Sequence, residues 1–170
     1  MVRDVTPLDA QGIVTIYNHY IVHTAVTFEE AQVTVDTMCA RIQRVKDASL
    51  PWLVLEEGGQ LLGYAYASPW KDRSAYRFSV EISVYLAPEQ IRKGNGSALY
   101  QALFQRLKDL GVHVAIGGIT LPNVPSVSLH EKFAMTKVAH FEEVGRKFGQ
   151  WLDVGYWQIK LSDAPPGEGV

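Results

Sequence analysis

Hydrophobic residues follow two spacings that alternate along the chain. Helical spacing, with an apolar residue every three or four positions, predicts four helices, one beginning after Thr6 and three at about 34–46, 95–110 and 124–133. Alternating or continuous apolar runs predict seven strands, at 2–6, 52–56, 61–68, 76–86, 112–119, 136–143 and 151–161. Antiparallel hairpins followed by a strand–helix–strand crossover are typical of an α/β domain. We therefore expect a mixed central β-sheet of about seven strands flanked by about four helices.

The length of the chain fits one domain. A chain of 170 residues can bury roughly 70% of its unfolded surface, so we expect residues 1–161 to form a single domain. Residues 162–170 contain Pro and Gly and little that could pack, which predicts a disordered tail.

Composition excludes several classes of partner. The 16 basic and 18 acidic residues give a net charge of −2, which argues against nucleic acid. Cys39 is the only cysteine, so a disulfide within the chain and a thiolate metal cluster are excluded, and we expect Cys39 to pack in the core. No run approaches the ~20 apolar residues of a membrane span. We expect a cytoplasmic protein with no metal and no membrane partner.

A glycine-containing turn follows the strand that ends at Leu86. The run 92–97 (Arg-Lys-Gly-Asn-Gly-Ser) leads directly into an amphipathic helix. Glycines let the backbone approach a ligand, and N–H groups at a helix start, with two adjacent cations, favour a pyrophosphate. The spacing fits neither common phosphate loop, because Ser97-Ala98 follows Gly96 and Leu99 occupies the place of a third glycine.

Glu81 stands in the middle of an apolar strand and shares one face with Ser83 and Tyr85. Glutamate is depleted in strands and costly to bury unpaired. Its presence indicates either a structural salt bridge or chemistry that needs a raised pKa.

A second polar segment follows the strand at 112–119. Asn123 can cap a short helix that has Pro125 in its first turn, and His130 lies further along that helix. His130 is either a packed or surface histidine, or a group that handles a proton.

The glycine turn resembles the acyl-CoA loop of the GNAT family of N-acetyltransferases, usually Gln/Arg-x-x-Gly-x-Gly/Ala. Gly94 and Gly96 match it, whereas Ile91 stands where the family usually has Gln or Arg; this removes one side chain but leaves the backbone amides. The resemblance extends from about residue 5 to 161. Within that range the chain is similar to the phosphinothricin N-acetyltransferases in several segments. They are Trp52-Leu53-Val54, Tyr64-Ala65-Tyr66-Ala67, Pro69-Trp70-Lys71, Leu121-Pro122-Asn123, Leu129-His130-Glu131 and Asp153-Val154-Gly155.

Two segments depart from that pattern. Residues 133–135 (Phe-Ala-Met) replace the usual Leu-Gly-Phe or Leu-Gly-Tyr, and residues 146–148 (Arg-Lys-Phe) resemble the related methionine sulfoximine and sulfone acetyltransferases. The resemblance therefore implies the GNAT fold and the transfer of an acetyl group from acetyl-CoA to the α-amine of a small glutamate-like amino acid. It implies direct transfer in a ternary complex.

The resemblance also assigns roles to residues. Glu81 would be the base, and His130 would assist it or protonate the CoA sulfur. The N–H of Val84 would donate to the oxyanion. The residues expected to bind acetyl-CoA are Val84, Tyr85, Leu86, Arg92, Lys93, Gly94, Asn95, Gly96, Ser97, Asn123 and Ser126.

The acceptor's anionic groups need cations and hydroxyl donors. The expected substrate-binding residues are Phe28, Lys71, Asp72, Arg73, Tyr76 and Tyr85, although residues 71–73 also fit a solvated hairpin loop. Trp70 and Trp151 are expected to pack.

Two alternatives stay open at this stage. The acceptor could be a polyamine, an aminoglycoside or a protein N-terminus, or the domain could be a CoA-binding sensor without catalysis. Relatives are commonly homodimers, and four aromatic residues near the C-terminus fit either an interface or the core: Phe148, Trp151, Tyr156 and Trp157.

Overall fold

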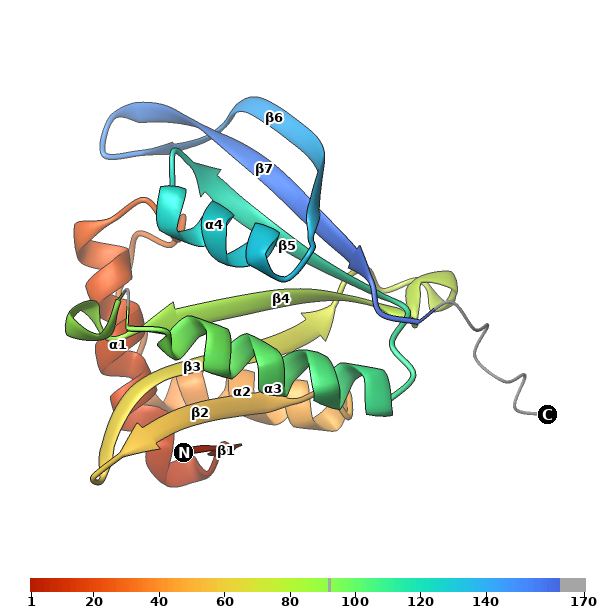
Figure 1. Cartoon of the computed structure of the whole chain (residues 1–170). Helices are drawn as coiled ribbons and strands as arrows, with labels where there is room; N and C mark the ends of the chain where they lie inside the picture. The colour runs from red at the N-terminus through yellow and green to blue at the C-terminus, as the bar shows by residue number, and fades with distance from the viewer. Residues whose placement is uncertain (92, 163–170) are drawn as a thin grey trace.

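The computed structural model describes residues 1–91 and 93–162. Within them one mixed sheet has the strand order β1-β2-β3-β4-β5-β7-β6 (Figure 1). The strands are β1 (Val2–Asp4), β2 (Trp52–Glu57), β3 (Gln60–Pro69), β4 (Ser79–Leu86), β5 (Val114–Leu121), β6 (Thr136–Lys147) and β7 (Gln150–Lys160). The mixed sheet predicted from the sequence is confirmed. The tail prediction for residues 163–170 and the role of Arg92 lie outside the described residues.

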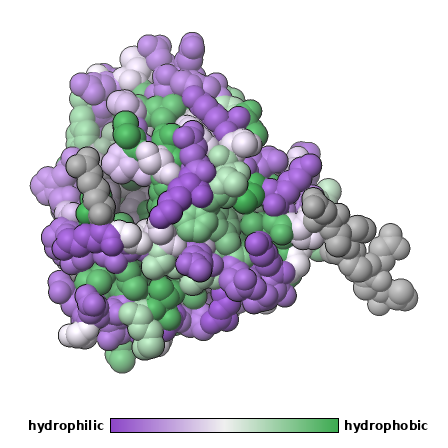
Figure 2. Space-filling model, in the orientation of Figure 1, coloured by the Kyte–Doolittle hydropathy of each residue, from purple (hydrophilic) through white to green (hydrophobic). Residues whose placement is uncertain are grey.

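Helices cover both faces of the sheet. The helices α1 (Ala10–His23) and α2 (Val35–Asp47) lie on one face, and α3 (Asn95–Asp109) and α4 (Val124–Lys132) lie on the other (Figure 1). Figure 2 shows hydrophilic side chains spread over the face that carries α3 and α4, between smaller hydrophobic areas. No helix of the described residues is long and apolar enough to span a bilayer.

Strand alternation divides the core into two clusters. Leu53 and Ala65 belong to the cluster under α3, whereas their neighbours Val54 and Tyr64 belong to the cluster under α1 and α2. Successive strand residues point to opposite faces, so both faces of β2 and β3 are apolar and buried. Cys39 is partly buried and packs against the α1 and α2 cluster.

Two predicted strands begin too early. Residues 74–76 form a 3₁₀ turn, closed by the Tyr76 N–H on the Arg73 carbonyl at 2.9 Å, so β4 starts only at Ser79. The Val112 N–H closes the end of α3 on the Leu107 carbonyl at 3.0 Å, so β5 starts two residues later than expected.

The strand β6 is longer than its hydrophobic pattern indicates, because it continues to Lys147, whereas β7 keeps its predicted length and begins one residue earlier. Lys147 pairs with Gln150 across a two-residue turn in which Phe148 and Gly149 both have positive φ, of 50° and 75°. Such a turn matches the twist of a hairpin. The hairpin carries Trp151 into solvent with 61% of its surface exposed, so the expectation that Trp151 packs is wrong.

The sheet opens between its two central strands. β4 and β5 pair in parallel only over Ser79–Glu81 and Val114–Ile116. Beyond Glu81, β4 stays paired with β3 as far as Leu86, and β5 stays paired with β7 as far as Leu121. The two strands therefore diverge, as Figure 1 shows, and leave a gap in the sheet.

Candidate active site

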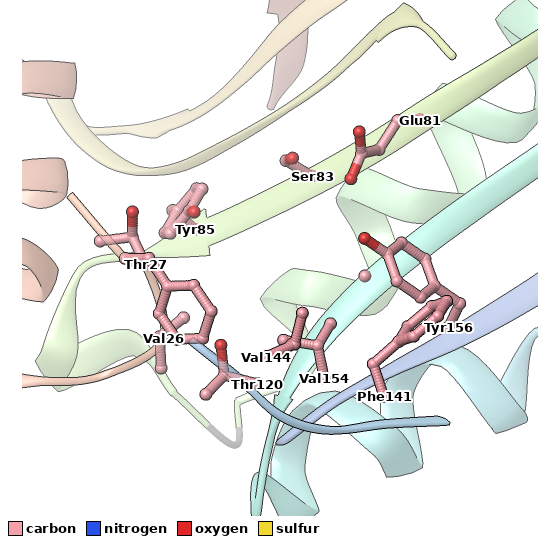
Figure 3. A pocket seen from close by; sticks show the side chains of 12 residues that line it. Val26, Thr27, Glu81, Ser83, Tyr85, Thr120, Phe141, Val144, Val154 and Tyr156 are labelled. Carbon is pink, nitrogen blue, oxygen red and sulfur yellow. The ribbon is translucent and has the colours of Figure 1, made fainter. Parts of the chain in front are cut away.

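A cavity of about 480 Å³ lies beside this gap, and we call it the Glu81 cavity. Its walls come from β4, β5, the β6–β7 hairpin and the loop between α1 and α2 (Figure 3). As the alternation in β4 predicts, three residues of one face line it together. Its lining is Val26, Thr27, Phe28, Glu81, Ser83, Tyr85, Gly118, Thr120, Phe141, Val144, Val154 and Tyr156.

Glu81 is the principal ionisable group of the cavity lining. Burial raises the pKa of its carboxyl, and the positive charge of Lys71 partly opposes that rise. Among residues 1–91 and 93–162, no hydrogen bond or ion pair engages the carboxylate. The structural salt bridge considered for this residue is therefore not made. A half-buried carboxylate of raised pKa at the edge of a cavity is suited to accept a proton.

Tyr156 faces Glu81 across the cavity, although the sequence pattern placed it only in an interface or in the core. Its hydroxyl points toward the carboxylate (Figure 3), and burial followed by the charge of Glu81 raises its pKa. A Cβ on Gly118 would lie 3.0 Å from Tyr156 Cε1 and 3.5 Å from Glu81 Oε1. Glycine at position 118 thus lets both groups approach β5. A glycine pair inside a predicted strand was the available signal of such an approach.

His130 is a packed histidine with both ring nitrogens engaged. It is 3% exposed. Nδ1 lies 2.7 Å from the Ser126 carbonyl oxygen, and Nε2 lies 3.0 Å from the Tyr100 hydroxyl. Because a carbonyl only accepts, Nδ1 carries the proton and Nε2 of the neutral ring accepts from Tyr100. Burial lowers the pKa of His130. Its remaining contact with the site is a narrow cavity of about 50 Å³ that it lines with Val84 and Asn123.

The unpaired edge of β4 presents backbone donors to the gap. The Phe78 carbonyl accepts from Val114 on the β5 side, whereas the Ala87 N–H donates to β3. Since alternate residues of a strand direct their backbone groups to the same side, the N–H groups of Val84 and Leu86 face the gap. The Leu86 carbonyl accepts the Tyr20 hydroxyl at 2.7 Å, so that oxygen is already engaged.

The glycine turn lies at the start of α3, as predicted. Gly94 caps the helix in the left-handed conformation with φ of 85°. A Cβ on Gly96 would lie 3.0 Å from Leu129 Cδ2, so the helix start packs closely on α4. Gly94, Gly96, Ser97, Leu86 and Ile91 line a cavity of about 350 Å³ between the two helices.

Side chains around this turn are held by local hydrogen bonds. Asn95 Nδ2 donates to the Gln90 side-chain oxygen at 3.2 Å, and the Ser97 hydroxyl accepts from Lys132 at 2.9 Å. Lys93 is exposed. Asn123 Oδ1 accepts the Ser126 N–H at 3.2 Å, which caps α4 as expected.

The expected substrate residues divide into two groups. Phe28 and Tyr85 line the Glu81 cavity. Lys71 lines a neighbouring cavity with Trp70 and Tyr156. Three others are exposed in the β3–β4 loop and do not line the Glu81 cavity: Asp72, Arg73 and Tyr76. In the part of the chain that the structure describes, no group of three or more His, Cys, Asp or Glu could hold a metal ion.

A sheet that opens beside a glycine-capped helix and an unpaired carboxylate defines an acyl-transfer enzyme of the GNAT type. The model of the acetyltransferase (GNAT) domain matches residues 2–155, and the chain belongs to this family of N-acetyltransferases.

Several relatives are similar over nearly the whole chain. A phosphinothricin N-acetyltransferase of Streptomyces viridochromogenes is 39% identical, covering 97% of this chain and 90% of its own. An L-methionine sulfoximine/L-methionine sulfone acetyltransferase of Salmonella typhimurium is 35% identical over 95% of both chains. The crystal structure of a GNAT superfamily phosphinothricin acetyltransferase from Sinorhizobium meliloti in complex with AcCoA has a TM-score of 0.96 and 34% identity, covering 100% of this chain and 94% of its own.

The buried His130 predicts a pH dependence of stability. The pKa of His130 in the folded state lies below the unfolded value of about 6.5. Between these two pKa values the unfolded state therefore binds more protons than the folded state. The stability that the neutral ring contributes is complete above about pH 6.5 and is lost as the pH falls from there to the folded pKa of His130. We expect His130→Gln to lower the unfolding free energy by about 1–3 kcal/mol at pH 7.5, and by less at pH 5.5.

Urea denaturation of wild type and variant at both pH values measures this difference. Substitution of the exposed His23 by Gln is the control. A stability difference for His130→Gln that stays constant from pH 7.5 to 5.5 would contradict a neutral buried ring.

Proposed function

We propose that the protein transfers an acetyl group from acetyl-CoA to the α-amine of a small glutamate-like amino acid, by direct transfer in a ternary complex. The observation that carries the proposal is the unpaired, half-buried Glu81 in a cavity at the opening of β4 and β5. The relatives named for phosphinothricin and for methionine sulfoximine or sulfone support this acceptor class.

The residues at the gap fit acetyl-CoA. Gly94 and Gly96 bring backbone N–H groups at the start of α3 close to a bound anion, where the helix dipole favours a pyrophosphate. The N–H groups of Val84 and Leu86 are free of β5 and fit the amide and carbonyl groups of an extended pantetheine arm. When bound, acetyl-CoA supplies an activated acyl group.

Glu81 supplies the chemistry that the acceptor needs. An α-amine is mostly protonated at neutral pH, and the resulting ammonium group has no free electron pair. A carboxylate of raised pKa takes one proton from it, which frees the nitrogen for attack on the acyl carbon. As the N–C bond forms, the C–S bond breaks and CoA leaves as a thiolate, which is neutralised by the second proton that the nitrogen loses. The Tyr156 hydroxyl, directed at the same point, fits a hydrogen bond to the acceptor nitrogen or to Glu81 (Figure 3).

The size and walls of the Glu81 cavity favour a small acceptor. Its volume of about 480 Å³ is in the range of small-molecule sites. Val144 and Val154 give it an apolar wall. Lys71, whose charge already acts on Glu81, is the expected partner of an acceptor carboxylate. The roles of Arg73 and Tyr76 and the cytoplasmic location stay predictions.

We infer that the protein forms a homodimer through the β6–β7 hairpin. Five apolar side chains of this hairpin are more than half exposed: Val138, Phe141, Val144, Phe148 and Trp151. Phe141 and Val144 also line the Glu81 cavity, whereas Phe148 and Trp151 stand at the turn of the hairpin, where exposed apolar side chains favour an interaction site. Light scattering on wild type should give twice the mass of the chain, and Trp151→Glu with Phe148→Glu should shift it toward one chain. A wild-type mass of a single chain would contradict the inference.

A thiol-release assay with acetyl-CoA tests the acceptor class. We expect phosphinothricin, methionine sulfoximine and methionine sulfone to release CoA with kcat/KM at least about tenfold above that of spermidine, because Lys71 favours an anionic acceptor. A preference for spermidine, an aminoglycoside or a peptide N-terminus would assign another acceptor. Absence of CoA release with every amine would favour a sensor.

Substitution of the base tests the mechanism. Glu81→Gln keeps the shape of the side chain and removes its proton acceptor, so kcat should fall by about 10²-fold or more at pH 7. Acetyl-CoA affinity by calorimetry should stay unchanged. The residual rate should rise with pH as free amine accumulates. Near-normal kcat at pH 7 would remove Glu81 as the base.

A further inference from the structure

Lys147, in the segment 146–148 that the sequence comparison singled out, is buried. Its side chain is 2% exposed although its neighbours in β6 face solvent. Its Nζ donates to the Thr24 carbonyl at 2.8 Å and to the Thr27 carbonyl at 2.8 Å. A buried ammonium is costly unless it is hydrogen-bonded, so these two bonds are what allows the charge to stay there.

These bonds join segments that are far apart in the sequence. Thr24 and Thr27 belong to the loop between α1 and α2, about 120 residues before Lys147. The charges of Glu30 and Glu29 act favourably on the ammonium. Glu29 is itself paired with Arg41 of α2, and the Thr27 hydroxyl bonds the Tyr17 hydroxyl of α1 at 2.9 Å. The loop is therefore fixed to the helices on one side and to β6 on the other.

The same loop forms one wall of the Glu81 cavity. Val26, Thr27 and Phe28 line the cavity on one side, and Val144 lines it from the hairpin. Phe28 lies directly on Gly145, where a Cβ would collide with the Phe28 ring. Gly145 has no positive φ, so its role is to leave room for Phe28 and not to relieve the backbone.

We propose that Lys147 is a positioning residue that holds the loop 24–28 against the β6–β7 hairpin and so sets the acceptor wall of the Glu81 cavity. The statement about the acceptor rests on the proposed function, whereas the statement about the loop does not. Lys147 does not line the Glu81 cavity, and it acts through Phe28 and Val26.

The test compares Lys147→Met with two other variants. Lys147→Met keeps the length of the side chain and removes the donor. Gly145→Ala keeps Lys147 and displaces Phe28. Lys160→Met removes an exposed lysine from β7 and is the matched control.

Hydrogen exchange of the amides of residues 24–29 measures directly how firmly the loop is held in place. We expect exchange at least about tenfold faster in Lys147→Met and unchanged in Lys160→Met, with exchange in α3 and β4 unchanged in both. Unchanged exchange of the loop in a folded Lys147→Met protein would overturn the proposal, whether or not the wild type acetylates an amino acid.

Steady-state kinetics then measure how the position of this wall affects KM for the acceptor. We expect KM for the amino acid to rise about tenfold in Lys147→Met and in Gly145→Ala, with KM for acetyl-CoA within about twofold of wild type. A looser loop with unchanged acceptor KM, or an equal rise of both KM values, would overturn the role as an acceptor wall. A wild type inactive with every amino acid would instead contradict the proposed function, and the exchange experiment would still decide the role of Lys147 in the loop.

Discussion

The point at which β4 and β5 part determines where everything else in the site lies. Three residue pairs join the strands, and then each strand follows its other neighbour. Backbone N–H and C=O groups rarely remain unpaired in a protein interior, so two such edges need a partner. Part of that demand is met by the Tyr20 hydroxyl, which donates to the Leu86 carbonyl. The N–H groups of Val84 and Leu86 remain available to a ligand.

The same parting explains the environment of Glu81. It is the last residue of β4 that pairs with β5, so its side chain stands where the sheet begins to open. Neighbouring strands still bury the carboxylate enough to raise its pKa, while the opening leaves it facing a cavity. Gly118 and Tyr156 complete this environment from β5 and β7. The raised pKa of Glu81 and its position at the gap between β4 and β5 are thus set by one feature of the sheet.

Local patterns in the sequence predicted the fold, the position of the glycine turn and the face of β4 that carries Glu81, because those features depend on neighbours in the chain. Helical and strand periodicity gave the elements, and the glycine turn and the face of Glu81 follow from a few adjacent residues. The contacts of Tyr156 and Lys147 were not predicted, because their partners are far away in the sequence. Lys147 donates to a carbonyl 120 residues before it. The prediction that Trp151 packs was wrong for a related reason, since hydrophobicity does not distinguish a core strand from an exposed hairpin.

The two walls of the Glu81 cavity differ in what holds them. The side that carries Glu81 is fixed by the central sheet, through β4 and β5. The opposite side is a loop and a hairpin whose contact depends on one buried ammonium and on the absence of a side chain at Gly145. Under the proposed function, changes on that side would alter which acceptor fits without moving Glu81.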